Sequence, residues 1–202
     1  MFSIVIDMNT KNCKEELIEI TTTLIRENKG DVDKVTIREI ANKSGVSVGL
    51  INYHFGNKDN LIAECVQRIV GNVVYSFQPI LDIDPNSSEF EQAKARVTQT
   101  AKQVFDFLFS HPSISKVSIL GDLNNYSEDS NSNYCLKAIM YQVKDAIVDI
   151  KDRERFAFSL ASLMQAAFLR SLTDTHFLGL DFSREKDRNK YIEDLINQLM
   201  KE

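Results

Sequence analysis

The sequence predicts an all-α fold. The 202-residue chain contains only three prolines and seven glycines, so residues that break helices are rare. Strand-like alternation of polar and apolar residues is scarce. Apolar residues recur instead at spacings of three and four, which is the period of one face of a helix. With 43% hydrophobic and 26% charged residues, the chain has the composition of an ordinary globular protein with a sizeable core.

Three helices are predicted in the N-terminal part of the chain. The first covers about residues 12–29 and carries one apolar stripe. The second opens at Thr36, where Glu39 three residues later completes a capping-box pattern, and it ends at Gly45. The third covers residues 47–55, with a serine as its N-cap. A short helix, a glycine-containing turn and a second short helix therefore follow one another.

Longer helices are predicted in the rest of the chain. The stretch NNYSEDSNSN, residues 124–133, is the most polar and turn-rich in the chain, so we expect a loop there. The predicted helices cover about residues 58–81, 87 or 88 to 110, 113–123, 134–150, 153–178 and 184–201. We expect two domains, 1–57 and 58–202.

The charge distribution limits which partners each part of the chain can have. The formal net charge of −5 argues against a protein that coats nucleic acid without sequence preference. Residues 36–58 nevertheless carry a local net charge of +2, so a nucleic-acid surface there would be small. Residues 61–202 carry 16 basic and 20 acidic side chains, which favours small-molecule or protein partners for that part.

Other features exclude several protein classes. The three cysteines, Cys13, Cys65 and Cys135, are widely separated and show no metal-binding spacing, so we expect reduced thiols and no bound metal. No apolar run is long enough for a membrane span, and the opening MFSIVID lacks the features of a signal peptide. The expected location is the cytoplasm.

The segment TIREIANKSGVSVGLINYHFGNKDNL, residues 36–61, carries the functional signal. Two short helices joined by a turn that contains glycine form a helix-turn-helix. Ile51 and Phe55, four residues apart, bury one side of the second helix. The opposite side then exposes the remaining positions, which are Val48, Gly49, Leu50, Asn52, Tyr53 and His54.

These exposed residue types suit the major groove of DNA. Small or apolar side chains allow close approach and contact with thymine methyl groups, and an asparagine can form two hydrogen bonds with adenine. Tyrosine and histidine can reach phosphates. Lys58 opens the next helix, where its charge and the free backbone N–H groups can bind a phosphate.

The segment resembles the tetracycline-repressor (TetR) family of transcription regulators. The family pattern is matched at twelve positions, which are Thr36, Arg38, Ile40, Ala41, Gly45, Val46, Ser47, Gly49, Ile51, Phe55, Lys58 and Leu61. The resemblance implies phosphate contacts from Thr36, Ser47, Tyr53, His54 and Lys58. It implies base contacts from Arg38, Val48, Gly49, Leu50 and Asn52. The sequence departs from the family at Asn52, where many members carry tyrosine, and at Ile25, where an aromatic residue is common.

The resemblance also implies a homodimer that binds a palindromic double-stranded operator. Residues 156–172 are apolar on nearly every face, so that helix must be buried on more than one side. The last helix carries a clean apolar stripe made of Ile192, Leu195, Ile196 and Leu199. In the family, the last two helices pair with those of a second copy. The alternative is that they only cover the core of their own chain.

The family further implies an effector pocket between the middle helices. The large side chains of this region are Phe105, Phe107, Phe109, Tyr126, Tyr134, Met140, Tyr141, Met164 and Phe168, and all but Phe107 form our set of candidate pocket residues. The alternative for each of them is an ordinary core position.

Three classes of function remain for the chain. The leading one is a repressor released from DNA by a small apolar effector, with no cofactor. The second is a DNA-binding protein of the same fold that is controlled by a protein partner. The third, an enzyme or a pure interaction module, is disfavoured because no catalytic constellation or phosphate-binding loop occurs.

Overall fold

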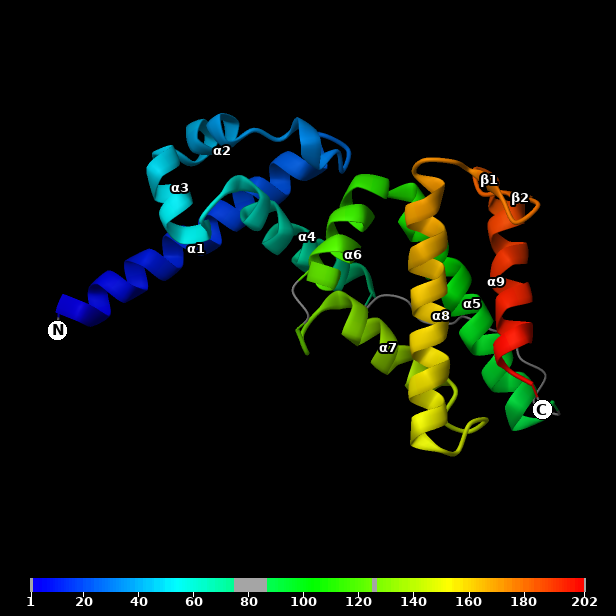
Figure 1. Ribbon diagram of the computed structural model, residues 1–202. Helices are drawn as coiled ribbons and strands as arrows, with labels where there is room; N and C mark the ends of the chain where they lie inside the picture. The colour runs from blue at the N-terminus through cyan, green and yellow to red at the C-terminus, as the bar shows by residue number, and fades with distance from the viewer. Residues whose placement is uncertain (1, 75–86, 125–126, 202) are drawn as a thin grey trace.

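The computed structural model describes residues 2–74, 87–124 and 127–201, and it confirms the all-α class. The elements are α1 (Phe2–Glu27), the 3-10 turn η1 (Val32–Lys34), α2 (Ile37–Ser44), α3 (Val48–Phe55), α4 (Lys58–Val74), α5 (Glu89–Ser110), α6 (Pro112–Asn124), α7 (Asn131–Gln142), α8 (Ile150–Ser171), β1 (His176–Phe177), β2 (Leu180–Asp181) and α9 (Glu185–Leu199). In Figure 1, α1 to α3 lie at one end of the molecule and α5, α8 and α9 at the other, with α4, α6 and α7 between them.

The helix-turn-helix forms where local capping chemistry predicts it. The Thr36 hydroxyl accepts a hydrogen bond from the backbone N–H of Glu39 at 3.2 Å, which caps α2. Gly45 ends α2 in the left-handed conformation with φ of 69°, a conformation that glycine adopts without strain. The Ser47 hydroxyl accepts from the N–H of Leu50 at 3.2 Å and caps α3.

The N-terminal core extends from α1 through α4. It contains Leu17 and Ile25 of α1, Ile40 of α2, Ile51 of α3 and Leu61 of α4, which are all 1% exposed or less. Packing therefore continues from the helix-turn-helix into α4, across the residue 57–58 boundary that we predict for the two domains. Because α4 belongs to this core, a movement of α4 carries the helix-turn-helix with it.

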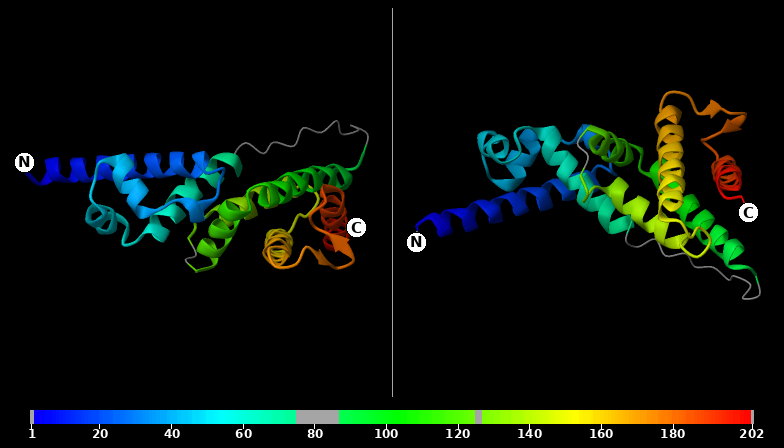
Figure 2. Two further views of the ribbon diagram at one scale, coloured as in Figure 1. Left: turned by 90° about the horizontal axis from the view of Figure 1, so that it is seen from above. Right: turned by 60° about the horizontal axis from the view of Figure 1, so that its bottom comes forward.

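The C-terminal core lies among α5, α7, α8 and α9. Figure 2 shows α8 and α9 on the same side of α5. Phe105, Phe168 and Phe182 are at most 1% exposed and come from α5, α8 and the segment between β2 and α9. Phe105 and Phe168 form edge-to-face contacts with Phe109, whose ring centroid lies 5.1 Å from that of Phe105 and 5.5 Å from that of Phe168.

Several predicted helix boundaries differ from the observed ones. α1 begins ten residues earlier than residue 12, at Phe2, and α7 begins at Asn131, inside the predicted loop. The reason at α7 is a local cap, since the Ser130 hydroxyl accepts from the N–H of Asn133. α8 begins at Ile150, because the Asp149 carboxylate accepts from the N–H groups of the first turn. The predicted end of the helix at residues 58–81 lies outside the described residues.

A β-hairpin replaces the predicted C-terminal end of the helix at 153–178. β1 pairs antiparallel with β2, and the turn contains Leu178 with φ of 54° and Gly179 with φ of 71°. Phe177 stacks on Phe182 at 4.3 Å between ring centroids, which holds the hairpin on the core. None of the described helices combines the length and apolar character needed to cross a membrane.

Candidate nucleic-acid interface and internal cavity

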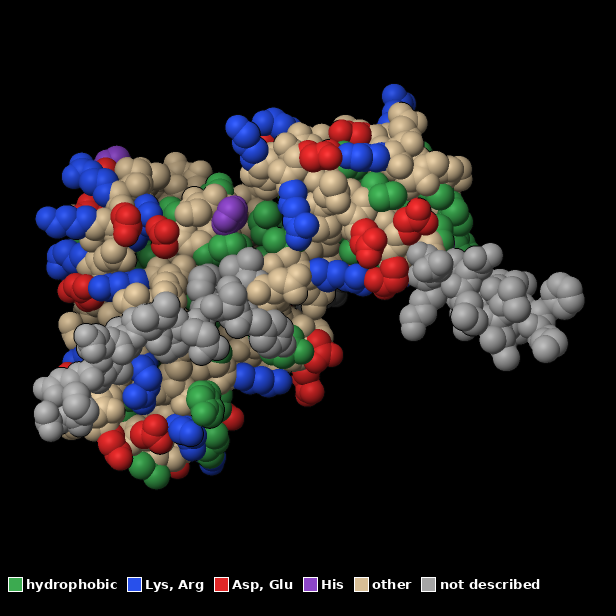
Figure 3. Space-filling model, turned by 180° about the vertical axis from the view of Figure 1, so that it is seen from behind, with side chains coloured by type: hydrophobic (Ala, Val, Ile, Leu, Met, Phe, Trp, Pro, Cys, Tyr) green, Lys and Arg blue, Asp and Glu red, His purple; other side chains and the backbone are tan. Residues whose placement is uncertain are grey.

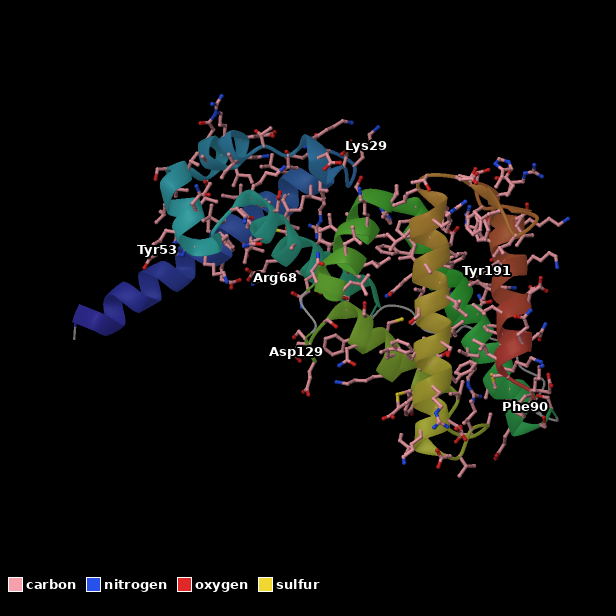
Figure 4. All side chains as sticks on the ribbon, in the orientation of Figure 1. Lys29, Tyr53, Arg68, Phe90, Asp129 and Tyr191 are labelled. Atoms are coloured by element: carbon pink, nitrogen blue, oxygen red, sulfur yellow. The ribbon has the colours of Figure 1, made fainter. Side chains whose placement is uncertain are left out.

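One side of α3 is buried and the other faces solvent, as the sequence predicts. Ile51 and Phe55 are 0% and 7% exposed. On the opposite side Gly49, Leu50 and Asn52 are exposed. Tyr53 is 77% exposed, and Figure 4 shows its side chain at the surface of α3. An exposed face with small, amide and phenol groups on an eight-residue helix can enter a major groove.

The two hydroxyls predicted to contact phosphates serve as helix caps. Thr36 and Ser47 are exposed, and each oxygen accepts a backbone hydrogen bond. A capping hydroxyl uses a lone pair, so its hydrogen remains available for donation to a phosphate. Val48, the first residue of α3, is half-buried.

Lys58 and His54 are more constrained than the sequence predicts. The Lys58 ammonium donates to the carbonyl of Val35 at 3.0 Å and so joins the start of α4 to the segment before α2. An ammonium has three donors, so it can still bind a phosphate. The Nε2 atom of His54 is buried and has no hydrogen-bond partner among the described residues. A phosphate contact from His54 would therefore use Nδ1.

The positive charge near α3 is modest. Arg38 is exposed on α2, whereas the Lys43 ammonium lies 2.6 Å from a carboxylate oxygen of Glu27. Figure 3 shows basic and acidic side chains intermingled over the back of the molecule. The charge distribution therefore favours contacts at a few phosphates over a broad basic surface.

A second feature is a cavity of about 60 Å³ between the middle helices. Its walls come from α4, α5, α6, α7 and α8. The lining residues are Val70, Val104, Phe107, Leu108, Ser115, Ser118, Ile119, Asn131, Ser132, Cys135, Ala161, Met164 and Gln165. Burial raises the pKa of the Cys135 thiol to about 11, so this wall residue stays uncharged at neutral pH.

The cavity is not lined by the large residues that the sequence suggests. Of the candidate pocket residues that the structure describes, only Met164 lines it, and Phe107, which the candidate set omits, lines it as well. Tyr141 is 69% exposed and lies under the Lys144 ammonium, so its prediction as a pocket residue is wrong.

The other candidate pocket residues lie elsewhere. Phe105, Phe109 and Phe168 belong to the aromatic core described above. Tyr134 and Met140 are partly buried on α7 and do not line the cavity. Tyr126 lies outside the described residues. Sequence reasoning missed the polar wall residues, although Ser115 and Ser118 stand out as hydroxyls one turn apart in an apolar helix.

The apolar stripe of α9 is not available to a second copy. Ile192 and Ile196 are fully buried and Leu195 is 6% exposed, because the stripe packs on the core of its own chain. The apolar stripe of α9 therefore covers the core of its own chain, and a contact of α9 with a second copy would use its outer face. On α8, in contrast, the apolar side chains of Phe158 and Leu163 are 64% and 42% exposed in the protomer.

Comparison with known proteins identifies the helix-turn-helix. Residues 28–65 match the family model described as bacterial regulatory proteins, tetR family. The fold is similar to a tetR-family transcriptional regulator from Streptomyces coelicolor, with a TM-score of 0.56, 20% identity, and 94% of this chain and 79% of that chain covered. It is also similar to a TetR transcriptional regulator from Rhodococcus sp. RHA1, with a TM-score of 0.59, 13% identity, and 95% and 96% coverage. No curated protein matches the sequence.

Proposed function

We propose that this chain, whose residues 28–65 match the family model of bacterial regulatory proteins, tetR family, is a homodimeric repressor. It binds a palindromic operator in the cytoplasm and is released by a small apolar effector. The observation that carries the proposal is the exposed face of α3, which presents Asn52 and Tyr53 opposite the buried Ile51 and Phe55.

A dimer is required because one eight-residue helix reaches only a few base pairs. Two copies of α3 about 34–36 Å apart enter successive major grooves on one side of the duplex. We place the dimer interface on the exposed face of α8, around Phe158 and Leu163, with α9 contributing its polar outer face. A symmetric contact of this kind buries the same apolar patch on both copies.

The position of α4 supports release by a ligand. α4 begins at Lys58, next to the helix-turn-helix, and its residue Val70 lines the cavity. A ligand larger than about 60 Å³ displaces the walls of the cavity when it binds, and α4 is one of those walls. If the ligand binds dimers with the wrong α3 spacing about 2.8 kcal/mol more favourably than dimers that fit DNA, the ratio of the two dimer forms shifts about a hundredfold.

The size of the cavity favours a second candidate mechanism. Ligand pockets of about 300–1,000 Å³ are usual, and this cavity is much smaller. The same DNA-binding protein would then be controlled by a protein partner that binds the surface and moves α4. Binding of small apolar molecules to the purified protein separates the two mechanisms.

Selection of DNA from a random-sequence pool by the purified protein tests the DNA-binding function. We expect enrichment of a palindromic motif by the wild type. Asn52→Ala should relax the preference at one position of each half-site, whereas Asn42→Ala, on the exposed side of α2, should leave the motif unchanged. A pool without enrichment would refute the proposal.

A further inference from the structure

The walls of the cavity combine two kinds of side chain, and none of those described is charged. Eight lining residues are apolar or thiol-bearing, and five are neutral and polar, namely Ser115, Ser118, Asn131, Ser132 and Gln165. The only ionisable group among them is the Cys135 thiol, which remains protonated because burial raises its pKa to about 11. An ion that entered the cavity would lose its hydration without gaining a partner of opposite charge.

The polar side chains include an unused hydrogen-bonding group. Ser115 is 1% exposed, and within the described part of the chain its Oγ atom has no hydrogen-bond partner. Ser118 lies one turn further along α6, and its Oγ accepts from the side-chain amide of Asn131 at 3.4 Å. A buried hydroxyl without a partner costs free energy, and a ligand that supplied the partner would recover it.

The same end of the cavity is connected to α4. The Asn131 amide donates to the backbone carbonyl of Gln67 at 3.1 Å, and the Gln67 amide donates to the carbonyl of Asp129 at 3.1 Å. Two hydrogen bonds thus hold α4 against the start of α7. Val70, which lines the cavity, lies less than one turn beyond Gln67 on α4.

We infer that the ligand of this cavity is an uncharged molecule with an apolar body and one hydrogen-bonding head, and that the head binds between Ser115 and Asn131. This inference rests on the proposed release by an effector and specifies its chemistry. A head with an acceptor atom competes with the Gln67 carbonyl for the Asn131 amide N–H that this carbonyl accepts, and the same head can bond with the Ser115 hydroxyl. Binding therefore weakens a contact that holds α4, while the apolar body presses on Val70.

Four probes of similar size distinguish this ligand class from the alternatives. Benzyl alcohol carries an uncharged hydrogen-bonding head, toluene has no polar head, benzoate is an anion, and benzylamine is a cation at neutral pH. Affinity is measured by calorimetry on the full chain without DNA. We expect benzyl alcohol to bind at least tenfold more tightly than benzoate or benzylamine, since both ions lose hydration in an uncharged cavity.

Two serine variants on α6 test the position of the head. Ser115→Ala should weaken benzyl alcohol about fivefold, the value of one neutral hydrogen bond, and leave toluene unchanged. Ser113→Ala removes a hydroxyl from the same helix outside the cavity and should change neither affinity. Because the Ser115 hydroxyl has no partner among the described residues, its removal should preserve the fold.

The side-chain amide of Asn131 provides an independent readout. In ¹H–¹⁵N spectra, benzyl alcohol should shift the Asn131 amide signals, whereas those of Asn133, which donates to the Glu128 carbonyl away from the cavity, should stay in place. Equal binding of benzoate or benzylamine, equal effects of the two serine variants, or no binding of any probe would overturn the inference. DNA selection is independent of these measurements, so failure of the DNA-binding function is recognised separately.

Discussion

Phe158 is the residue whose replacement tests the proposed α8 interface most sharply. Its side chain is 64% exposed in the protomer, which leaves most of its apolar surface available to a partner. In a symmetric dimer each copy buries its own Phe158 against the partner. Phe158→Ala should therefore reduce the free energy of dimerisation by two contributions, one from each copy.

The size of the effect follows from the exposed area. A free phenylalanine side chain exposes roughly 200 Å². With 64% of it uncovered, about 130 Å² of Phe158 is available for burial, worth about 3 kcal/mol at 25 cal/mol per Å². Two copies give an upper value of about 6 kcal/mol. Loss of half to all of this weakens dimerisation between about a hundredfold and ten-thousandfold.

Sedimentation velocity over a dilution series measures the dimer dissociation constant. Leu123→Ala is the matched control, because Leu123 is 68% exposed on α6, away from α8. The dimer dissociation constant of the Leu123→Ala protein should equal that of the wild type. Far-UV circular dichroism establishes that both variants keep their helices. A folded Phe158→Ala protein that dimerises as tightly as the wild type would refute the assignment of this face.

Three further substitutions separate core, base and phosphate roles. Ile192→Asp places a carboxylate at a fully buried site, so thermal denaturation should show loss of the folded state, and a stable folded monomer would contradict this packing. Asn52→Ala should cost about 1–3 kcal/mol at the selected site in binding titrations, and an unchanged affinity would remove it from the base-reading set. Lys58→Met should reduce the slope of log affinity against log salt by about 0.9. An unchanged slope would mean that the ammonium only binds the Val35 carbonyl.

The helix-turn-helix could be predicted because its determinants are local. The hydroxyls of Thr36 and Ser47 accept from N–H groups three residues away, and Gly45 supplies the left-handed turn. The alternation of buried Ile51 with exposed Asn52 also follows from helical geometry alone. Each of these features depends on a few neighbouring residues, so a single sequence contains the information.

The C-terminal features depend on residues far apart in the chain. Phe105 and Phe168 have side chains that suit either a cavity wall or a core. They lie in the core because the rings of Phe109 and Phe182 pack against them. The α9 stripe is equally suited to a partner or to its own core, and packing against the core of its own chain decides between them. The hairpin strands contain two residues each, too few for a recognisable alternation.

Hydroxyl-radical footprinting of the protein on its selected DNA tests the central claim most directly. Two α3 helices in successive major grooves should give two protected regions, related by two-fold symmetry, with centres about 10 base pairs apart on one side of the duplex. A Phe158→Ala protein at a concentration where it is monomeric should lose both regions together. A single protected region, or protection by the wild type that competitor DNA of unrelated sequence removes equally well, would contradict the account.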